Sequence, residues 1–201
     1  MGGRADGCVV QGQDVSLHSF RKKFFCRMNA VLPQPHRFLK FKVLFAIDIS
    51  SAACTTTATT LKRNVPGHFN SVVQMDLLSA IHVTGGIDVL VFNPPYVPTE
   101  KADSWAGNIK FAWAGEGMGM ATSWKVLDSL TVQLSKHYSV ADGKDVLSTD
   151  GVFYLVAIEP NNPQKILEIM HERGIQGDII LKRKAGREVL YVLRFSRYTH
   201  K

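Results

Sequence analysis

The sequence has little cysteine and no long hydrophobic run. Three cysteines, Cys8, Cys26 and Cys54, are scattered over 201 residues without a CxxC pair. An odd and dispersed set argues against a disulfide framework and a zinc site, and it favours the cytosol or the nucleus. The seven histidines are equally dispersed. No apolar stretch approaches the roughly 18 residues of a membrane-spanning helix, so no membrane segment is predicted.

Acidic residues are scarce at the start of the chain. Residues 1–45 hold eight lysines and arginines but only two aspartates, whereas residues 46–201 hold sixteen basic and fifteen acidic residues. The excess positive charge therefore lies in the first part, and the nearly neutral remainder predicts no nucleic-acid-binding face. We interpret residues 1–40 as a basic, poorly ordered leader without a strand, with three alternatives: a targeting segment, a basic binding arm, or the product of alternative splicing or an imperfect gene model. The domain is expected over residues 41–201.

The rest of the chain has the composition of a globular domain, with 45% hydrophobic and 20% charged residues. Strands are predicted at residues 41–47, 71–75, 87–92, 152–158, 179–182 and 189–195, and helices at residues 50–62 and 162–173. The alternation predicts an α/β fold with a mostly parallel sheet covered by helices on both faces. The last two strands are expected to form an antiparallel hairpin.

Polar residues follow three successive strands of this predicted sheet. Asp48 and Asp76 come after the first two strands, and the sequence Asn93-Pro94-Pro95-Tyr96 comes after the third. An open parallel sheet binds ligands at the carboxyl ends of its strands. We therefore expect the functional site at these positions, although each aspartate is also typical of a helix cap or a turn.

The Asn-Pro-Pro-Tyr sequence is suited to holding an amino group. Pro94 and Pro95 have no N–H and restrict the backbone, so the segment is stiff and offers carbonyl oxygens rather than donors. Asn93 adds a side-chain carbonyl, and Tyr96 adds a flat ring on which a planar amide or base can stack. Grouped acceptors of this kind can orient an –NH₂ group for attack on a reactive methyl group. The alternative is an ordinary proline turn.

The same residues resemble a known family. DVLVFNPPYVPT (residues 88–99), AWAGEG (112–117) and FYLVAIEPNNPQKILEIM (153–170) are similar to the eukaryotic HemK-type methyltransferases. The resemblance covers roughly residues 42–201. It implies a Rossmann-like class I methyltransferase fold, S-adenosyl-L-methionine as cofactor, and transfer of a methyl group to the glutamine of the Gly-Gly-Gln loop in a peptide-chain release factor. It also implies a small zinc-binding activator protein as heterodimer partner. The location expected from the cysteine content is the cytoplasm, with the nucleus left open as a further location.

The resemblance also assigns roles to individual residues. Asn93 and the Pro94 carbonyl would hold the substrate amide, with Asn93 also next to the cofactor, while Pro95 would shape the bend and Tyr96 would pack on the substrate. Asp48 would bind the cofactor ribose and Asp76 would lie beside the adenine. Trp113 would line the substrate side or serve in packing; these two roles are left open.

Two features depart from the family pattern. The family's first strand ends in a Glu-x-Gly-x-Gly-x-Gly loop that approaches the cofactor, and nothing in residues 1–40 matches it. The first strand and helix unit is therefore expected to be incomplete, and residues 131–139 are interpreted as an insertion. Two alternative functions follow: a catalytically impaired isoform or paralogue that retains partner binding, and a nucleic-acid adenine N6-methyltransferase, which the neutral domain disfavours.

Overall fold

The structure is a computed structural model of the chain. It describes residues 9–11, 15–17, 23–27, 43–64, 69–79, 81–83, 86–98, 114–115, 119–134 and 146–196. Two compact units are present: the first comprises residues 1–90 and 142–148, and the second comprises residues 91–141 and 149–201. The predicted boundary between residues 40 and 41 lies outside the described residues and stays a prediction.

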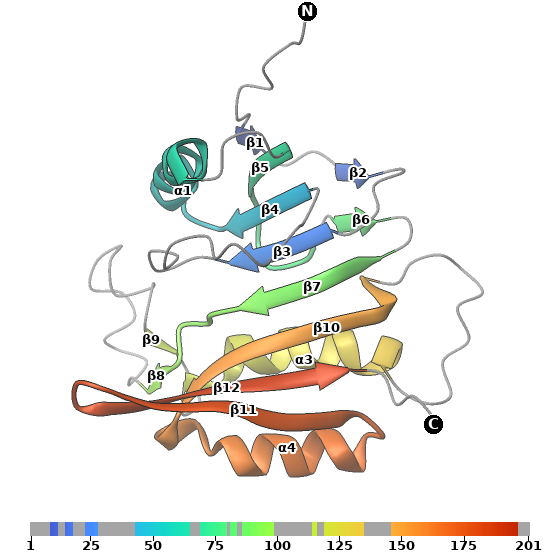
Figure 1. Cartoon of the computed structure of the whole chain (residues 1–201), viewed down its shortest axis with the longest axis vertical. Coiled ribbons are helices and arrows are strands. Elements are labelled where there is room, and N and C mark those ends of the chain that lie inside the picture. The colour runs from blue at the N-terminus through green and yellow to red at the C-terminus, as the bar shows by residue number, and fades with distance from the viewer. Residues whose placement is uncertain are drawn as a thin grey trace, which may run out of the picture. The chain divides into compact units, whose positions relative to one another are not determined.

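The first unit contains a sheet whose inner strands are parallel. Its strand order is β1 (Val9–Gln11), β5 (Phe69–Gln74), β4 (Val43–Asp48), β3 (Lys23–Arg27) and β7 (Ile87–Phe92). The pairings β1 with β5, β5 with β4, and β4 with β3 are all parallel. A separate two-stranded parallel sheet joins β2 (Val15–Leu17) to β6 (Ile81–Val83). Figure 1 shows the labelled strands.

The strand β3 is the main departure from the sequence-based expectation. No strand was predicted before residue 41, yet Lys23 pairs with Val43 and Cys26 with Ala46. The segment KFFCR has the aromatic content of a strand, but the lysines and arginines around it masked the signal. The connection from β3 to β4, residues 28–42, lies outside the described residues and contains no glycine.

The first unit is held together by the packing of one helix on β4 and β5. Every residue of β4 is buried, as is typical of an inner strand of a parallel sheet. The helix α1 (Ser51–Asn64) begins where Ser50 Oγ accepts a hydrogen bond from Ala53 N at 3.3 Å, which caps its first turn. The core between them consists of Leu44, Ala46, Cys54, Leu61 and Val72. This packing places the end of β4 beside the start of α1.

The second unit is built on a long antiparallel hairpin. The strand β10 (Leu147–Ile158) begins in the first unit and continues here, followed in the sheet by β12 (Glu188–Ser196) and β11 (Gln176–Ala185). Both pairings are antiparallel, and Ile158 is opposite Leu190. Gly186 turns the chain between β11 and β12 with φ 63°, the glycine position of a type II′ hairpin. The sequence-based prediction of a C-terminal hairpin is confirmed.

Two helices complete the second unit. The helix α4 (Pro163–Glu172) packs on β11 and β12, and Ile166 and Met170 are buried beneath it. The helix α3 (Ala121–Leu134) buries Val126, Leu127 and Leu130. An ion pair of 2.6 Å between Arg173, at the end of α4, and Asp128 on α3 joins the two helices. Within the core of this unit the rings of Phe153 and Phe195 stack at 6.0 Å between centroids.

The predicted elements from residue 41 onward are confirmed in type, with ends shifted by a few residues. The helix α3 was not predicted, and its last residues occupy the start of the proposed insertion at 131–139; residues 135–139 lie outside the described residues. In the part of the chain that the structure describes, no helix is long and apolar enough to cross a membrane.

Candidate active site

The Asn-Pro-Pro-Tyr sequence, residues 93–96, lies in the second unit and connects β7 to the short strand that follows it. We call this segment the corner; in Figure 1 it is the connection from β7 to β8 (Val97–Pro98). The strand β8 pairs in parallel with β9 (Ala114–Gly115), so the chain leaves the sheet of β7 at the corner. Pro94 and Pro95 are buried, whereas Asn93 and Tyr96 are half-buried. The corner is therefore anchored by its prolines and partly open at its two ends.

The side-chain oxygen of Asn93 is an unsatisfied acceptor. Its Oδ1 atom is buried and accepts no hydrogen bond from the described part of the chain. A buried carbonyl oxygen without a donor costs about 1–3 kcal/mol, so native proteins rarely keep one without a reason. A ligand N–H bound at the corner would remove this cost. The observation fits the amide-holding role predicted for Asn93.

The backbone carbonyl at the other end of the corner is held by a residue that the sequence reasoning missed. Asn161 Nδ2 donates a hydrogen bond of 2.8 Å to the Tyr96 carbonyl oxygen, and Asn161 is only 5% exposed. Asn161 lies in the short 3₁₀ helix η3 (Glu159–Asn161) that follows β10. The signal was present in the sequence, as an asparagine that lies between two prolines and three residues after the end of a predicted strand.

A glycine packs on the same carbonyl. Gly119 has φ 75°, and a Cβ atom at that position would lie 2.0 Å from the Tyr96 oxygen. Only glycine permits both this backbone conformation and this close approach. Gly119 lies two residues before α3. The Tyr96 carbonyl therefore contacts Asn161, which follows β10, and Gly119, which precedes α3.

The tyrosine of the corner stays protonated over a wide pH range. Burial raises the pKa of the Tyr96 hydroxyl, and the nearby carboxylate of Glu188 on β12 raises it further. The side chain therefore presents a neutral, half-buried ring beside the corner, as the proposed packing on a planar substrate group requires.

In the first unit the structure brings together the two predicted aspartates. Asp48 ends β4, and Asp76 follows the neighbouring strand β5 by two residues. The Asp48 carbonyl accepts a hydrogen bond from Met75 N at 3.1 Å, which joins the two strand ends directly. Asp48 and Asp76 thus lie at the same edge of the sheet, where parallel strands present ligand-binding residues.

The two aspartates differ in their surroundings. Asp48 is 4% exposed, and its Oδ1 atom accepts a hydrogen bond from Ser50 N at 2.9 Å. Asp76 is exposed and begins a turn, with its carbonyl accepting from Ser79 N at 3.2 Å. Of the two structural roles that the sequence left open, turn formation is present at both aspartates, whereas the cap of α1 is Ser50 rather than Asp48. These turns leave the carboxyl groups suitable as acceptors for hydroxyl or amino groups, which fits the polar part of a nucleoside cofactor.

Trp113 lies outside the described residues. The corner belongs to the second unit, and the two aspartates belong to the first.

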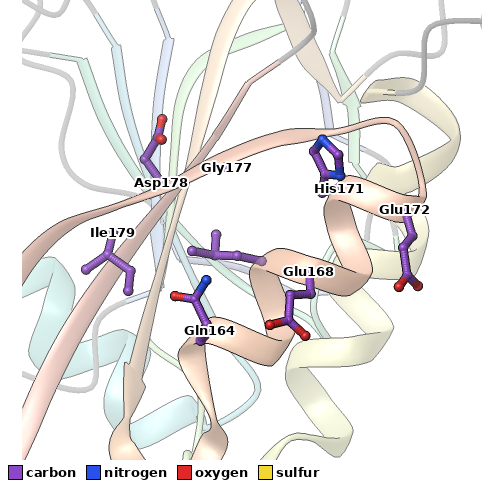
Figure 2. Close-up of a pocket in the computed structure, with 8 residues that line it drawn as sticks. Gln164, Glu168, His171, Glu172, Gly177, Asp178 and Ile179 are labelled. Atoms are coloured by element: carbon purple, nitrogen blue, oxygen red, sulfur yellow. The ribbon is translucent and has the colours of Figure 1, made fainter.

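A hollow of about 580 Å³ lies elsewhere in the second unit, between α4 and β11. Figure 2 shows the lining residues Gln164, Glu168, His171 and Glu172 on the helix and Gly177, Asp178 and Ile179 on the strand. It contains none of the predicted site residues. Among the described residues, no group of three or more histidines, cysteines or acids is arranged to hold a metal ion.

No protein-family model matches the sequence. Curated relatives do: the chain is 40% identical over 162 residues to the eRF1 methyltransferase catalytic subunit mtq2 of Schizosaccharomyces pombe, covering 77% of this chain and 64% of the relative. It is 38% identical over 152 residues to methyltransferase HEMK2 of Homo sapiens, covering 75% of this chain and 64% of the relative. The chain therefore spans just under two thirds of the length of these relatives.

The comparison with solved structures also finds methyltransferases. The structure of the E. cuniculi Mtq2–Trm112 complex, responsible for the methylation of the eRF1 translation termination factor, superposes with a TM-score of 0.50 at 25% identity, covering 80% of this chain and 88% of that chain. The N-terminal domain of human METTL16, solved in complex with SAH, superposes with a TM-score of 0.52 at 13% identity, covering 78% of this chain and 53% of that chain. The similarity to METTL16, at 13% identity, concerns the fold alone.

The sheet and its helices therefore have the class I methyltransferase fold, as the sequence predicted. The chain is a homologue of the Mtq2 and HEMK2 methyltransferases, the HemK-type proteins that its sequence resembles.

Proposed function

We propose that this protein is an S-adenosylmethionine-dependent methyltransferase that modifies the side-chain amide of the glutamine in a Gly-Gly-Gln loop of a peptide-chain release factor. The homology to eRF1 methyltransferases supports the reaction and the acceptor. The observation that carries the proposal in this chain is the buried, unsatisfied Oδ1 atom of Asn93, next to two prolines that have no backbone donor.

The corner would act by orientation. An amide nitrogen is a poor nucleophile because its lone pair is delocalised into the carbonyl group. Asn93 Oδ1 and the Pro94 carbonyl would each accept one hydrogen of the glutamine –NH₂ group and fix the direction of its nitrogen. Pro95 would keep the bend stiff, and the Tyr96 ring would cover the planar amide. Orientation of this kind supplies much of the rate in reactions with a reactive partner.

The bound cofactor would supply an electrophilic methyl group on a positively charged sulfur. In the net reaction the amide nitrogen gains the methyl group, the sulfur keeps the electron pair of the broken bond, and the proton lost from nitrogen passes to solvent. We assign Asp48 to the ribose hydroxyls and Asp76 to the adenine, because both follow neighbouring strands at one edge of the sheet. Asn93 would also lie beside the cofactor.

We also propose that the protein acts as a heterodimer with a small activator protein. The E. cuniculi homologue was solved with Trm112, which supports a heterodimer for this chain as well. We propose that the partner is a zinc-binding protein and that the complex acts in the cytoplasm and also in the nucleus.

The test is methyl transfer from labelled cofactor to a release-factor domain that contains Gly-Gly-Gln, with and without the activator protein. The Asn93→Ala variant is expected to lose at least about 100-fold in kcat, since the acceptor that orients the nucleophile is gone. Asn93→Asp keeps oxygen acceptors and is expected to retain more activity than Asn93→Ala.

Asn64→Ala is the matched control, because Asn64 is an exposed asparagine at the end of α1 in the first unit. It should transfer methyl groups at the wild-type rate. An Asn93→Ala variant that is as active as the control would refute the role of Asn93. Absence of transfer by the wild type with its partner would refute the proposed reaction.

One observation favours a second candidate, a catalytically impaired homologue that retains partner binding. The connection after β3, residues 28–42, contains no glycine, whereas a close approach of backbone N–H groups to the cofactor usually requires it. Isothermal titration with S-adenosylmethionine separates the two candidates. Micromolar binding supports the enzyme, and no binding by a folded sample that still binds the activator supports the impaired homologue.

A further inference from the structure

At the last residue of the corner, Tyr96, the backbone carbonyl is held by the side chain of Asn161. The two prolines remove backbone donors, so the corner has few hydrogen bonds of its own with which to hold its shape. At its exit, the Tyr96 carbonyl accepts from Asn161 Nδ2 at 2.8 Å. Gly119 packs against the same oxygen, so closely that a Cβ atom would overlap it. The position of this carbonyl is therefore set from two sides.

The two polar atoms of Asn161 have separate partners. Its Oδ1 atom accepts from Ile158 N at 2.8 Å, at the last residue of β10, while its Nδ2 atom donates to Tyr96. The first bond determines which way the amide group faces, since a reversed amide would place two donors together at Ile158. Asn161 thus ties the corner to the sheet through a side chain that is 5% exposed.

The helix η3 that carries Asn161 is itself well supported. It contacts both β8 and β12. Pro160 and Pro163 restrict the backbone around it, and Asn162 adopts a left-handed conformation with φ 53° that starts α4. Asn161 is therefore attached to a rigid part of the second unit.

From this geometry we propose that Asn161 is a positioning residue for methyl transfer: by holding the Tyr96 carbonyl, it sets the orientation of the Asn93 acceptor and the Tyr96 ring toward the amide group. The inference rests on the proposed function. Displacements of about 1 Å at such a site lower rates by up to about 100-fold, so a single hydrogen bond at the corner has a measurable effect.

The sharpest variant is Asn161→Asp, which is nearly isosteric. The aspartate keeps an oxygen that accepts from Ile158 N, but its second oxygen is a negatively charged acceptor facing the Tyr96 carbonyl. We expect kcat to fall about 10- to 100-fold while KM for the cofactor stays within about twofold. A protonated aspartic acid can donate to Tyr96 again, so activity relative to wild type should recover as the pH falls.

The charged groups around position 161 set where this recovery occurs. Glu159 lies two residues away on η3, and the carboxylate of Glu188 on β12 acts on Tyr96, the partner of Asn161; both disfavour an ionised carboxylate and shift recovery to higher pH. Lys182 on β11, which interacts with Glu159, acts in the opposite direction. On the side of the corner the neighbouring titratable group is Tyr96, which is neutral here.

The control is Asn162→Asp, the same change one residue away. Its oxygen still caps α4 by accepting from Lys165 N, so activity and pH profile should match wild type.

A second measurement does not depend on activity. Hydrogen–deuterium exchange of the segment 93–98 should be faster in Asn161→Asp than in wild type and in Asn162→Asp, and should slow again at low pH relative to wild type. Loss of kcat with this recovery supports the proposal. Unchanged kcat and exchange would overturn it, as would a loss of kcat without any recovery at low pH. If the wild type transfers no methyl group, the proposed function fails, and unchanged exchange would then also reject the hydrogen-bonding role of Asn161.

Discussion

The carboxylate of Asp48 accepts a hydrogen bond of 2.9 Å from the backbone N–H of Ser50, at the junction between β4 and α1. This contact orients the side chain at the carboxyl end of a fully buried strand. It also gives Asp48 a structural role next to the proposed cofactor role, and the two can be separated by mutation.

Asp48→Asn should separate them, because the amide oxygen can still accept from Ser50 while the negative charge is lost. Hydrogen bonds to a charged group contribute about 1.5–3 kcal/mol, so S-adenosylmethionine should bind about 10- to 100-fold more weakly by isothermal titration. The free energy of unfolding should change by less than about 1 kcal/mol. Asp150→Asn, an exposed site on β10, is the control. Wild-type affinity in Asp48→Asn would contradict the assignment.

Gly119→Ala should be considerably more harmful than an alanine at Gly174. Both glycines have positive φ, 75° and 79°, so each substitution costs about 1–2 kcal/mol of backbone strain. At Gly174 a Cβ atom meets nothing within 4 Å, but at Gly119 it collides with the Tyr96 carbonyl. Urea unfolding should show an additional loss of about 1–3 kcal/mol for Gly119→Ala. Equal losses in the two variants would mean that the corner does not contact Gly119 tightly.

Tyr96 should ionise at higher pH than an ordinary tyrosine. The absorbance change at 295 nm, taken as the difference between wild type and Tyr96→Phe, reports its pKa. Glu188→Gln should lower that pKa without returning it to the usual value, since burial is the larger cause. Glu172→Gln, an exposed acid on α4, should leave it unchanged.

The same shift has a consequence for stability. Because the pKa of Tyr96 is raised in the folded state, its contribution is fully present below the pKa of the unfolded chain, about 10, and is lost as the pH rises above it. The free energy of unfolding, measured with urea, should therefore fall more in wild type than in Tyr96→Phe when the pH is raised above 10. A similar pH dependence in both proteins would contradict the burial of the hydroxyl.

Much of the fold could be predicted from the sequence because short apolar runs bounded by polar residues mark buried strands. The strands β4, β7 and β10 and the final hairpin follow this pattern. The helix α3 was missed because its apolar residues are interrupted by Ser123, Ser129 and Thr131, which give a weak periodic signal. The strand β3 was missed because the basic residues around its two phenylalanines weaken the local pattern, and its pairing with β4 is a non-local contact.

Part of the candidate site could likewise be predicted from the sequence, and part depends on the tertiary structure. Local sequence alone indicated the corner, because two consecutive prolines after a buried strand have no N–H with which to continue the sheet and restrict the backbone in any fold. It also placed Asp48 and Asp76 at strand ends. Only the tertiary structure decided what holds the corner. Asn161 is 65 residues from Tyr96 along the chain, and Gly119 is in a different element again. Their roles come from distances in space, which arise only when β10, η3 and α3 pack together.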